Sequence, residues 1–266
     1  MRTDTVPYAD IAEYLKREDT ILIPVGAVEQ YGPHLATGTE LRLCEQIAIE
    51  AGEIAGLAVA PIVPFNYSVM FVDYPGTMTC DMATVEAYVG QVCHGLAQQG
   101  FRRFFFVNIH AGSLGPLESV SRSLRTRWGA FGGLIDVFSI MRDVGGVEYK
   151  TKQAPTGHAS EMVTSVALHV CPELVFMDRV QAPPQPLRPF VDGVRTVSSG
   201  KVVMGGSSFA VFSDIRDYTP LGMQGDASGA SADQGRLVWE AARTYIAEAA
   251  GKFSRMNLDA EGIVHA

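Results

Sequence analysis

The chain has 266 residues, of which 47% are hydrophobic and 19% charged, so it can build a full core and is too apolar to be disordered. A formal net charge of −8 argues against nucleic acid as a partner, because binding it would need a basic face. No apolar run reaches the roughly 18 residues of a membrane-spanning helix, and the first residues lack the apolar segment of a signal peptide. The four cysteines form no C-x-x-C pair, so we expect buried thiols and a cytoplasmic protein.

Stretches with the pattern of buried strands alternate along the chain with stretches of helical apolar period. The predicted helices and strands, in chain order, are helix 7–17, strand 19–25, helix 40–55, strand 57–64, helix 81–99, strand 101–110, helix 114–128, strand 133–140, helix 160–170 and helix 231–252. Asp81 is the predicted N-cap of the helix that follows it. This alternation predicts an α/β fold whose mainly parallel sheet is covered by helices on both faces.

One region departs from this alternation. The stretch QAPPQPLRPFVD at 181–192 is rich in proline, and the segment after it, to about 212, alternates apolar and polar residues as strands do. We therefore expect a single domain over 1–266 with a hairpin excursion at about 181–212.

Carboxylates and imidazoles follow three of the predicted elements. Glu29 and Glu40 come after the first strand, His110 after the third, and His158 and Glu161 after the fourth strand and a loop. Because ligands bind at the carboxyl ends of parallel strands, we expect these side chains to gather at one edge of the sheet. Such a set can hold a divalent metal ion, which would polarise a carbonyl group and activate a water molecule. A histidine after a strand can equally be a hydrogen-bonded structural residue.

A second kind of chemistry is possible at the same edge. The run AGSLG follows the third strand and opens a helix, so it approximates the G-x-S-x-G nucleophile elbow. Ser113 would then be the nucleophile, His158 its base and Asp136 the acid. Against this, a serine in the first turn of a helix is usually a cap, and Asp136 is placed inside a predicted strand.

Five motifs in order resemble those of the creatininase (creatinine amidohydrolase) family. They are ILIPVGAVEQYGPHLATGTE, YPGTMTC, VNIHAGS, GHASEMVTS and TPLGMQGDAS, and together they extend over about residues 18–250. The resemblance implies a three-layer α/β/α sandwich, a homo-oligomer such as a hexamer, and one or two divalent metal ions (Zn, Mn or Fe). It also implies hydrolysis of a C–N bond in a small amide, lactam or formamide. Carried over position by position, Glu29, Glu40 and His110 match metal ligands of the family.

Four positions depart from the family pattern. Tyr31 stands where the family has the histidine of E-Q-H, and Glu40 stands where it has a bridging aspartate. Gly112 and Val163 occupy positions at which relatives carry a glutamate ligand, while Glu161 lies two residues before Val163. These changes predict a mononuclear or asymmetric metal site.

Three functions stay open at this point. The first is metal-dependent C–N hydrolysis, with His158 or Glu161 moving a proton to the leaving group and Tyr31 donating a hydrogen bond to the oxyanion. The second is other carbonyl chemistry, namely C–C hydrolysis or isomerisation of a cyclic ketone. The third is a degenerate member that binds a ligand without catalysis.

Three further polar residues are candidates for contacting the substrate or the ligands. We expect His34 to hydrogen-bond a ligand rather than bind the ion, and Asn108 to fix the turn before His110. Ser113 is retained as a candidate on its position alone.

Overall fold

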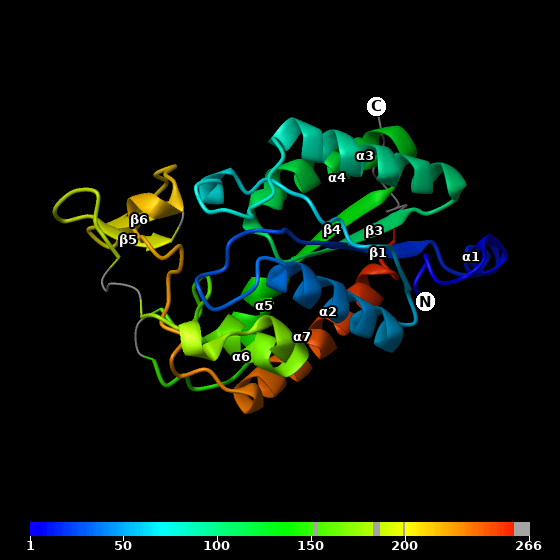
Figure 1. Cartoon of the computed structure of the whole chain (residues 1–266). Coiled ribbons are helices and arrows are strands. Elements are labelled where there is room, and N and C mark those ends of the chain that lie inside the picture. Colours follow the sequence, from blue (N-terminus) through cyan, green and yellow to red (C-terminus); the bar gives the residue numbers. More distant parts are fainter. Residues whose placement is uncertain (152–153, 183–186, 199, 258–266) are drawn as a thin grey trace.

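The computed structural model describes residues 1–151, 154–182, 187–198 and 200–257 (Figure 1). Its central sheet has the strand order β2-β1-β3-β4, and each neighbouring pair is parallel. The strands are β1 (Thr20–Val25), β2 (Ala58–Val59), β3 (Arg103–Asn108) and β4 (Phe131–Asp136). β2 and β3 lie on opposite sides of β1. The chain therefore winds in one direction from β1 to β2 and in the other direction from β2 to β3 and β4. The carboxyl ends of β1 and β3 thus form a topological switch point, where open α/β sheets bind ligands.

Helices cover both faces of this sheet. They are α1 (Tyr8–Tyr14), α2 (Thr39–Ala55), α3 (Met82–Gln99), α4 (Leu114–Trp128), α5 (Val137–Val144), α6 (Glu161–Val170) and α7 (Ala232–Phe253). Figure 1 shows α3 and α4 on one face and α2, α5, α6 and α7 on the other, so the expected α/β/α sandwich is confirmed. Over the residues described, no helix is long and apolar enough to cross a membrane.

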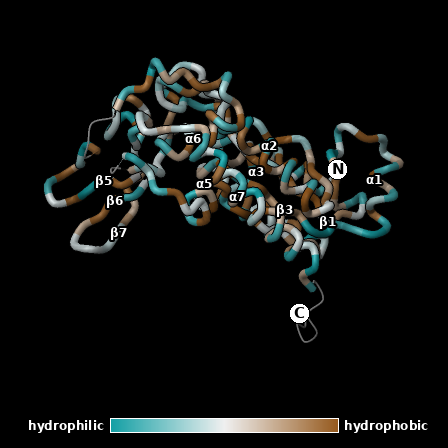
Figure 2. Tube along the Cα trace, turned by 90° about the horizontal axis from the view of Figure 1, so that it is seen from below, coloured by the Kyte–Doolittle hydropathy of each residue, from teal (hydrophilic) through white to brown (hydrophobic). Residues whose placement is uncertain are grey.

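The core is divided by the sheet into two clusters. Ile21 and Ile23 of β1 pack with α3 and α4, whereas Leu22 between them packs with α2 and α7. Phe104 and Phe105 of β3 divide in the same way, because successive side chains of a strand point to opposite faces. The hydrophobic colouring of Figure 2 is concentrated along these strands and the helices beside them.

Two predicted strands differ from the observed ones. The strand predicted at 57–64 is only Ala58–Val59, continued by a single bridge between Val25 and Val63. The strand predicted at 133–140 is wrong in its second half, because β4 ends at Asp136 and α5 begins at the next residue. The Asp136 carboxylate accepts hydrogen bonds from the backbone N–H groups of Phe138 and Ser139, which caps α5 and ends the strand.

The region predicted as a hairpin is a three-stranded antiparallel sheet. Its strands are β5 (Arg195–Ser198), β6 (Lys201–Met204) and β7 (Ser207–Phe209), and Figure 1 shows it set apart from the central sheet. The start of this excursion packs through Leu187 against Phe71, Ile215 and Tyr218. Part of the proline-rich stretch, 183–186, lies outside the described residues.

Candidate metal centre

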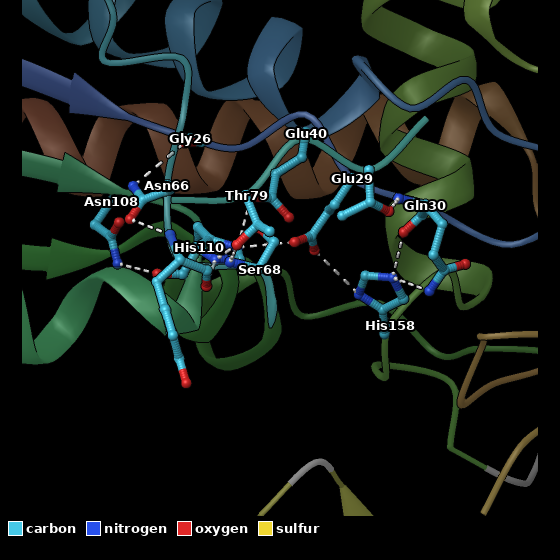
Figure 3. Close-up of polar contacts among 12 residues, drawn as sticks. Gly26, Glu29, Gln30, Glu40, Asn66, Ser68, Thr79, Asn108, His110 and His158 are labelled. Carbon is cyan, nitrogen blue, oxygen red and sulfur yellow. Dashed lines mark hydrogen bonds and ion pairs between the residues drawn. The ribbon is translucent and has the colours of Figure 1, made fainter. Parts of the chain in front are cut away.

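Three buried side chains converge at the switch point between β1 and β3. Glu29 lies in the loop after β1, Glu40 in the first turn of α2, and His110 directly after the turn that ends β3. Figure 3 shows the three side chains pointing toward one another. The prediction that these residues meet is therefore confirmed.

The spacing of the three side chains fits a metal ion. His110 Nδ1 lies 3.3 Å from Glu29 Oε2 and 3.2 Å from Glu40 Oε1. Ligands of a tetrahedral ion with bonds of about 2.0 Å are separated by about 3.3 Å, as these atoms are. All three residues are at most 3% exposed, and the facing oxygens, Glu29 Oε2 and Glu40 Oε1, accept no hydrogen bond in the described structure. Buried carboxylate oxygens without donors are the atoms that a cation would satisfy.

The charges of the cluster are strongly coupled. Burial raises the pKa of Glu29, while the nearby His110 lowers it and Glu40 raises it further. Burial alone would lower the pKa of His110, but Glu29 and Glu40 together raise it well above its ordinary value. Without an ion, therefore, His110 carries the proton that balances the two carboxylates. A metal ion has to displace this proton in order to bind.

His110 is oriented by a backbone carbonyl. Its Nε2 donates to Tyr67 O at 2.8 Å, and since a carbonyl only accepts, the neutral ring presents the Nδ1 lone pair to the carboxylates. Gly112 makes this arrangement possible, because a Cβ atom at Gly112 would overlap the Tyr67 carbonyl oxygen and lie 2.6 Å from His110 Nε2. No ligand-bearing side chain fits at position 112, where relatives were expected to carry a glutamate.

His158 lies beside the cluster, and a hydrogen bond from one of its ring nitrogens, Nε2, fixes its orientation. Its Nε2 donates to Gln30 O at 3.0 Å, which leaves Nδ1 free at 4.0 Å from Glu29 Oε1 (Figure 3). The ring stacks on Phe71, with centroids 4.7 Å apart, and meets the Tyr31 ring edge-on at 4.2 Å. Burial lowers the pKa of His158 to about 3, so its ring is neutral and its Nδ1 is a hydrogen-bond acceptor that holds a proton only weakly.

Tyr31 lies in the position that the family resemblance assigns to a histidine ligand. Its side chain is 2% exposed and lines the same cavity as Glu29 and Glu40. Burial, reinforced by the two carboxylates, raises the pKa of Tyr31 well above its ordinary value. The phenol therefore keeps its proton, which makes it a hydrogen-bond donor and a poor metal ligand.

The structure does not bring Glu161 to the site. Glu161 is the first residue of α6, and its carboxylate accepts hydrogen bonds from the backbone N–H groups of Lys150 and Thr151 and from Thr151 Oγ1. It is absent from the cavity lining, so the catalytic role predicted for it is not supported. Val163, two residues later, is fully buried in the apolar core.

His34 and Asn108 take structural positions near the cluster. His34 was expected to hydrogen-bond a ligand, but its Nε2 pairs with Thr164 Oγ1 at 2.9 Å and so ties the loop after β1 to α6. Burial lowers the pKa of His34 to about 4. Asn108 Nδ2 donates to His110 O at 2.8 Å, the contact expected of a residue that fixes this turn.

The alternative serine chemistry has no assembled triad. Ser113 is buried in the short helix after His110, and its Oγ has no hydrogen-bond partner in the described part of the chain. The His158 ring is bonded to Gln30, and the Asp136 carboxylate is bonded to Phe138 and Ser139 of its own helix. Among the described residues, no hydrogen bond joins Ser113, His158 and Asp136, so the structure lends this triad no support.

The cluster opens into a cavity of about 190 Å³. Met70 and Phe71 contribute apolar surface to its lining. Asp136 and Phe138 also line it and were not assigned to the metal site from the sequence, because the turn from β4 to α5 was predicted as strand. Gln224, from the loop before α7, lines it as well. The contribution of Tyr67 comes from its backbone, for which a sequence carries no signal.

Three curated relatives resemble most of the chain. A mycofactocin precursor peptide peptidase of Mycolicibacterium smegmatis is 28% identical over 226 residues, 82% of this chain and 79% of its own length. Creatinine amidohydrolase of Pseudomonas putida is 27% identical over 68% of this chain and 77% of its own length. A 3-dehydro-scyllo-inosose hydrolase of Thermotoga maritima is 25% identical over 91% of this chain and 80% of its own length.

Solved structures share the fold over nearly the whole chain. A putative creatinine amidohydrolase from Bacteroides fragilis superposes with a TM-score of 0.76 at 22% identity, covering 97% of this chain and 98% of the other. A creatininase described as a manganese form superposes at 0.74 and 22% identity, covering 96% of this chain and 99% of the other. The creatininase (creatinine amidohydrolase) family profile matches residues 5–250. Since that match extends over far more than half of the sequence, the chain belongs to the creatininase family.

Proposed function

We propose that the protein is a single-metal hydrolase that cleaves a C–N bond in a small cyclic amide, lactam or formamide-type molecule. The observation that carries the proposal is the buried triangle of Glu29, Glu40 and His110, whose ligand atoms have the spacing of a metal site. Relatives named as an amidohydrolase and as a peptidase support C–N hydrolysis. A homo-oligomer, such as the hexamer that the family resemblance implies, and a cytoplasmic location belong to the same proposal.

Glu29, Glu40 and His110 would hold the ion, and zinc, manganese and iron all accept two carboxylates and an imidazole. When bound, the ion would polarise the substrate carbonyl group and lower the pKa of a water molecule. One ion fits better than two, because the neighbouring positions offer a protonated phenol at Tyr31, no side chain at Gly112 and a core residue at Val163. Among the described residues, these three ligands form the one cluster of metal-binding side chains.

The neighbouring residues can handle the proton and the developing charge. The free Nδ1 of His158 lies beside Glu29, where it is placed to relay a proton to the leaving nitrogen. The Tyr31 hydroxyl can donate a hydrogen bond to the oxygen that becomes negative as the carbonyl is attacked. Phe71 and Tyr31 fix the His158 ring between them, so the base is already in place when substrate enters.

A second candidate is hydrolysis of a C–C bond in a cyclic ketone. The relative named 3-dehydro-scyllo-inosose hydrolase favours it, because its similarity extends over 91% of this chain. The same metal ligands and the same base would serve either reaction, so the two reactions are distinguished by identifying their products.

The test is hydrolysis of a panel of lactams, formamides, short peptides and cyclic ketones by zinc- or manganese-loaded protein, with products identified by mass spectrometry. We expect an amine and an acid from the amide members, and loss of both metal and turnover in His110→Ala. His94→Gln is the matched control, since His94 lies on the outer face and contacts Trp128 and Ser123. Undiminished turnover in His110→Ala would refute the proposal.

A further inference from the structure

Among the described residues, no arginine or lysine lines the cavity above the metal ligands. Among the described residues that line it, the ionisable ones besides Tyr31 are Glu29, Glu40, His110, His158 and Asp136. Sites that bind carboxylate or phosphate groups through side chains generally use arginine or lysine. A substrate with an anionic group next to its scissile bond would find no such partner here.

With an ion bound, the cavity keeps a negative charge. The two carboxylates of Glu29 and Glu40 balance a divalent cation, and a ligating His110 is neutral. Asp136 is then the remaining charged group of the lining. Arg142, an exposed residue of α5, interacts electrostatically with Asp136 from outside the cavity lining and is itself ion-paired with Asp143. In a cavity with apolar walls, a carboxylate attracts cations and repels anions more strongly than it would in water.

Asp136 is held at a fixed place near the ligands. It ends β4 in register with Asn108 of β3, two residues before His110, and neighbouring strands are about 4.8 Å apart. Its Oδ1 accepts from Phe138 N at 3.0 Å and Ser139 N at 3.3 Å, and its Oδ2 accepts from Ser139 Oγ at 2.8 Å. These bonds use the N–H groups at the start of α5, which could otherwise have bound an anion. A carboxylate accepts about four hydrogen bonds, so acceptor capacity remains toward the cavity.

The rest of the cavity is small and apolar. Met70, Phe71, Ile109 and Phe138 contribute to its walls, and its volume is about 190 Å³. An engineered protein cavity of about 150 Å³ accommodates benzene, so a single small ring with one substituent is the size that fits.

We propose that Asp136 determines specificity, by selecting small amides that carry a cationic or N–H-rich group and rejecting those that carry a carboxylate or phosphate. This inference rests on the proposed function, because the scissile bond is placed at Glu29, Glu40 and His110. The ammonium or amidinium end of such a substrate would contact the Asp136 carboxylate, while its ring contacts the Phe71 and Phe138 side of the cavity.

The test uses binding rather than turnover. Three small hydroxamic acids, whose hydroxamate oxygens chelate metal ions, carry respectively an ammonium, a neutral alkyl and a carboxylate group: glycine hydroxamate, propionohydroxamate and succinic monohydroxamate. Their Kd values are measured by calorimetry on the zinc-loaded protein. The variants are Asp136→Asn, which removes the charge while asparagine can still cap α5, and Asp143→Asn, a matched control at the exposed end of the same helix.

We expect the wild-type protein to bind the ammonium probe most tightly and the carboxylate probe most weakly. Asp136→Asn should reduce the ratio of these two affinities about tenfold or more, and Asp143→Asn should leave it unchanged. Comparing ratios cancels the intrinsic differences between the probes. An unchanged ratio in Asp136→Asn, or a carboxylate probe that binds as tightly as the ammonium probe, would overturn the inference. Failure of the proposed function is seen separately, as failure of the protein to take up zinc before any probe is added.

Discussion

Tyr31 places a protonated phenol beside two carboxylates, and it is one of the three positions on which the proposal of a single ion rests. If its hydroxyl donates to the developing oxyanion, Tyr31→Phe removes that donor and leaves the ring and the metal ligands in place. We expect kcat to fall about 10²- to 10³-fold, the usual effect of losing one oxyanion donor, with unchanged metal content. Steady-state kinetics and metal analysis of the same preparation check this. A change of less than about threefold would remove Tyr31 from the chemistry.

Glu161 lies three residues after His158 in the sequence, but its carboxylate binds the backbone of residues 150–151 and has a structural role. Burial alone would raise its pKa, but hydrogen bonds from Thr151 and Lys150 lower it, so the group is charged and fully satisfied. Glu161→Ala removes the acceptor of the partly buried N–H groups of Lys150 and Thr151 and should lower the free energy of unfolding by about 1–3 kcal/mol, measured by urea denaturation. The exposed Glu53→Ala should change it by less than about 0.5 kcal/mol.

The competing catalytic role of Glu161 predicts the opposite pattern. Metal content per folded chain should stay the same in Glu161→Ala if the residue only anchors the 150–151 segment. A variant of normal stability whose turnover drops more than about 100-fold would return Glu161 to the catalytic set.

At the scale of elements, Glu50 joins α2 to α7. It accepts hydrogen bonds from Gln46, from Trp239 Nε1 at 2.9 Å and from Arg243 Nη1 at 3.1 Å. Burial alone would raise the pKa of Glu50, but these bonds outweigh it and lower the pKa. A carboxyl with a lowered pKa stabilises the fold above its unfolded pKa of about 4.3, and this contribution is lost as pH falls through the folded value.

Glu50→Gln should therefore destabilise the protein by about 1–2 kcal/mol at pH 7 and by progressively less below about pH 4. Denaturant titrations of both proteins across this range measure the difference. A difference that does not depend on pH would show that Glu50 contributes through packing and not through its charge.

Long periodic elements were predictable from the sequence, and short transitions were not. The helix over 81–99 is observed as Met82–Gln99 and capped by Asp81 as predicted, because its apolar period and its cap agree. The turn from β4 to α5 was missed, since an apolar run from Gly133 to Ile140 has no period that separates a strand from a short helix. Asp136 carries the missing signal, but its capping bonds are visible only in three dimensions.

The sequence predicts those parts of the candidate site that follow from the order of the strands in the sheet. Glu29, Glu40 and His110 follow or flank strands that are neighbours, so their convergence follows from the rule that parallel strands end at one edge. The direction of the Glu161 and His34 side chains depends on partners far along the chain or in other loops. The sequence shows that position 112 lacks a ligand side chain, but the close approach of Gly112 to the Tyr67 carbonyl is visible only in three dimensions.

For the whole molecule, the topology concentrates unpaired polar atoms at one point of an otherwise apolar core. Two helical layers bury both faces of the sheet, and the chain reverses its direction of winding where β1 and β3 end. Two buried carboxylates side by side are costly unless a cation or a shared proton compensates them. The fold therefore stabilises this cluster best with a metal ion in it.

The most direct measurement is the metal content per chain, by plasma mass spectrometry, of protein purified without a chelator or a His-tag. The account predicts about one equivalent of zinc, manganese or iron, removed together with turnover by a chelator and restored by adding the ion. A content near zero that persists after incubation with each of the three metals would contradict the metal centre, and two equivalents would contradict its single ion.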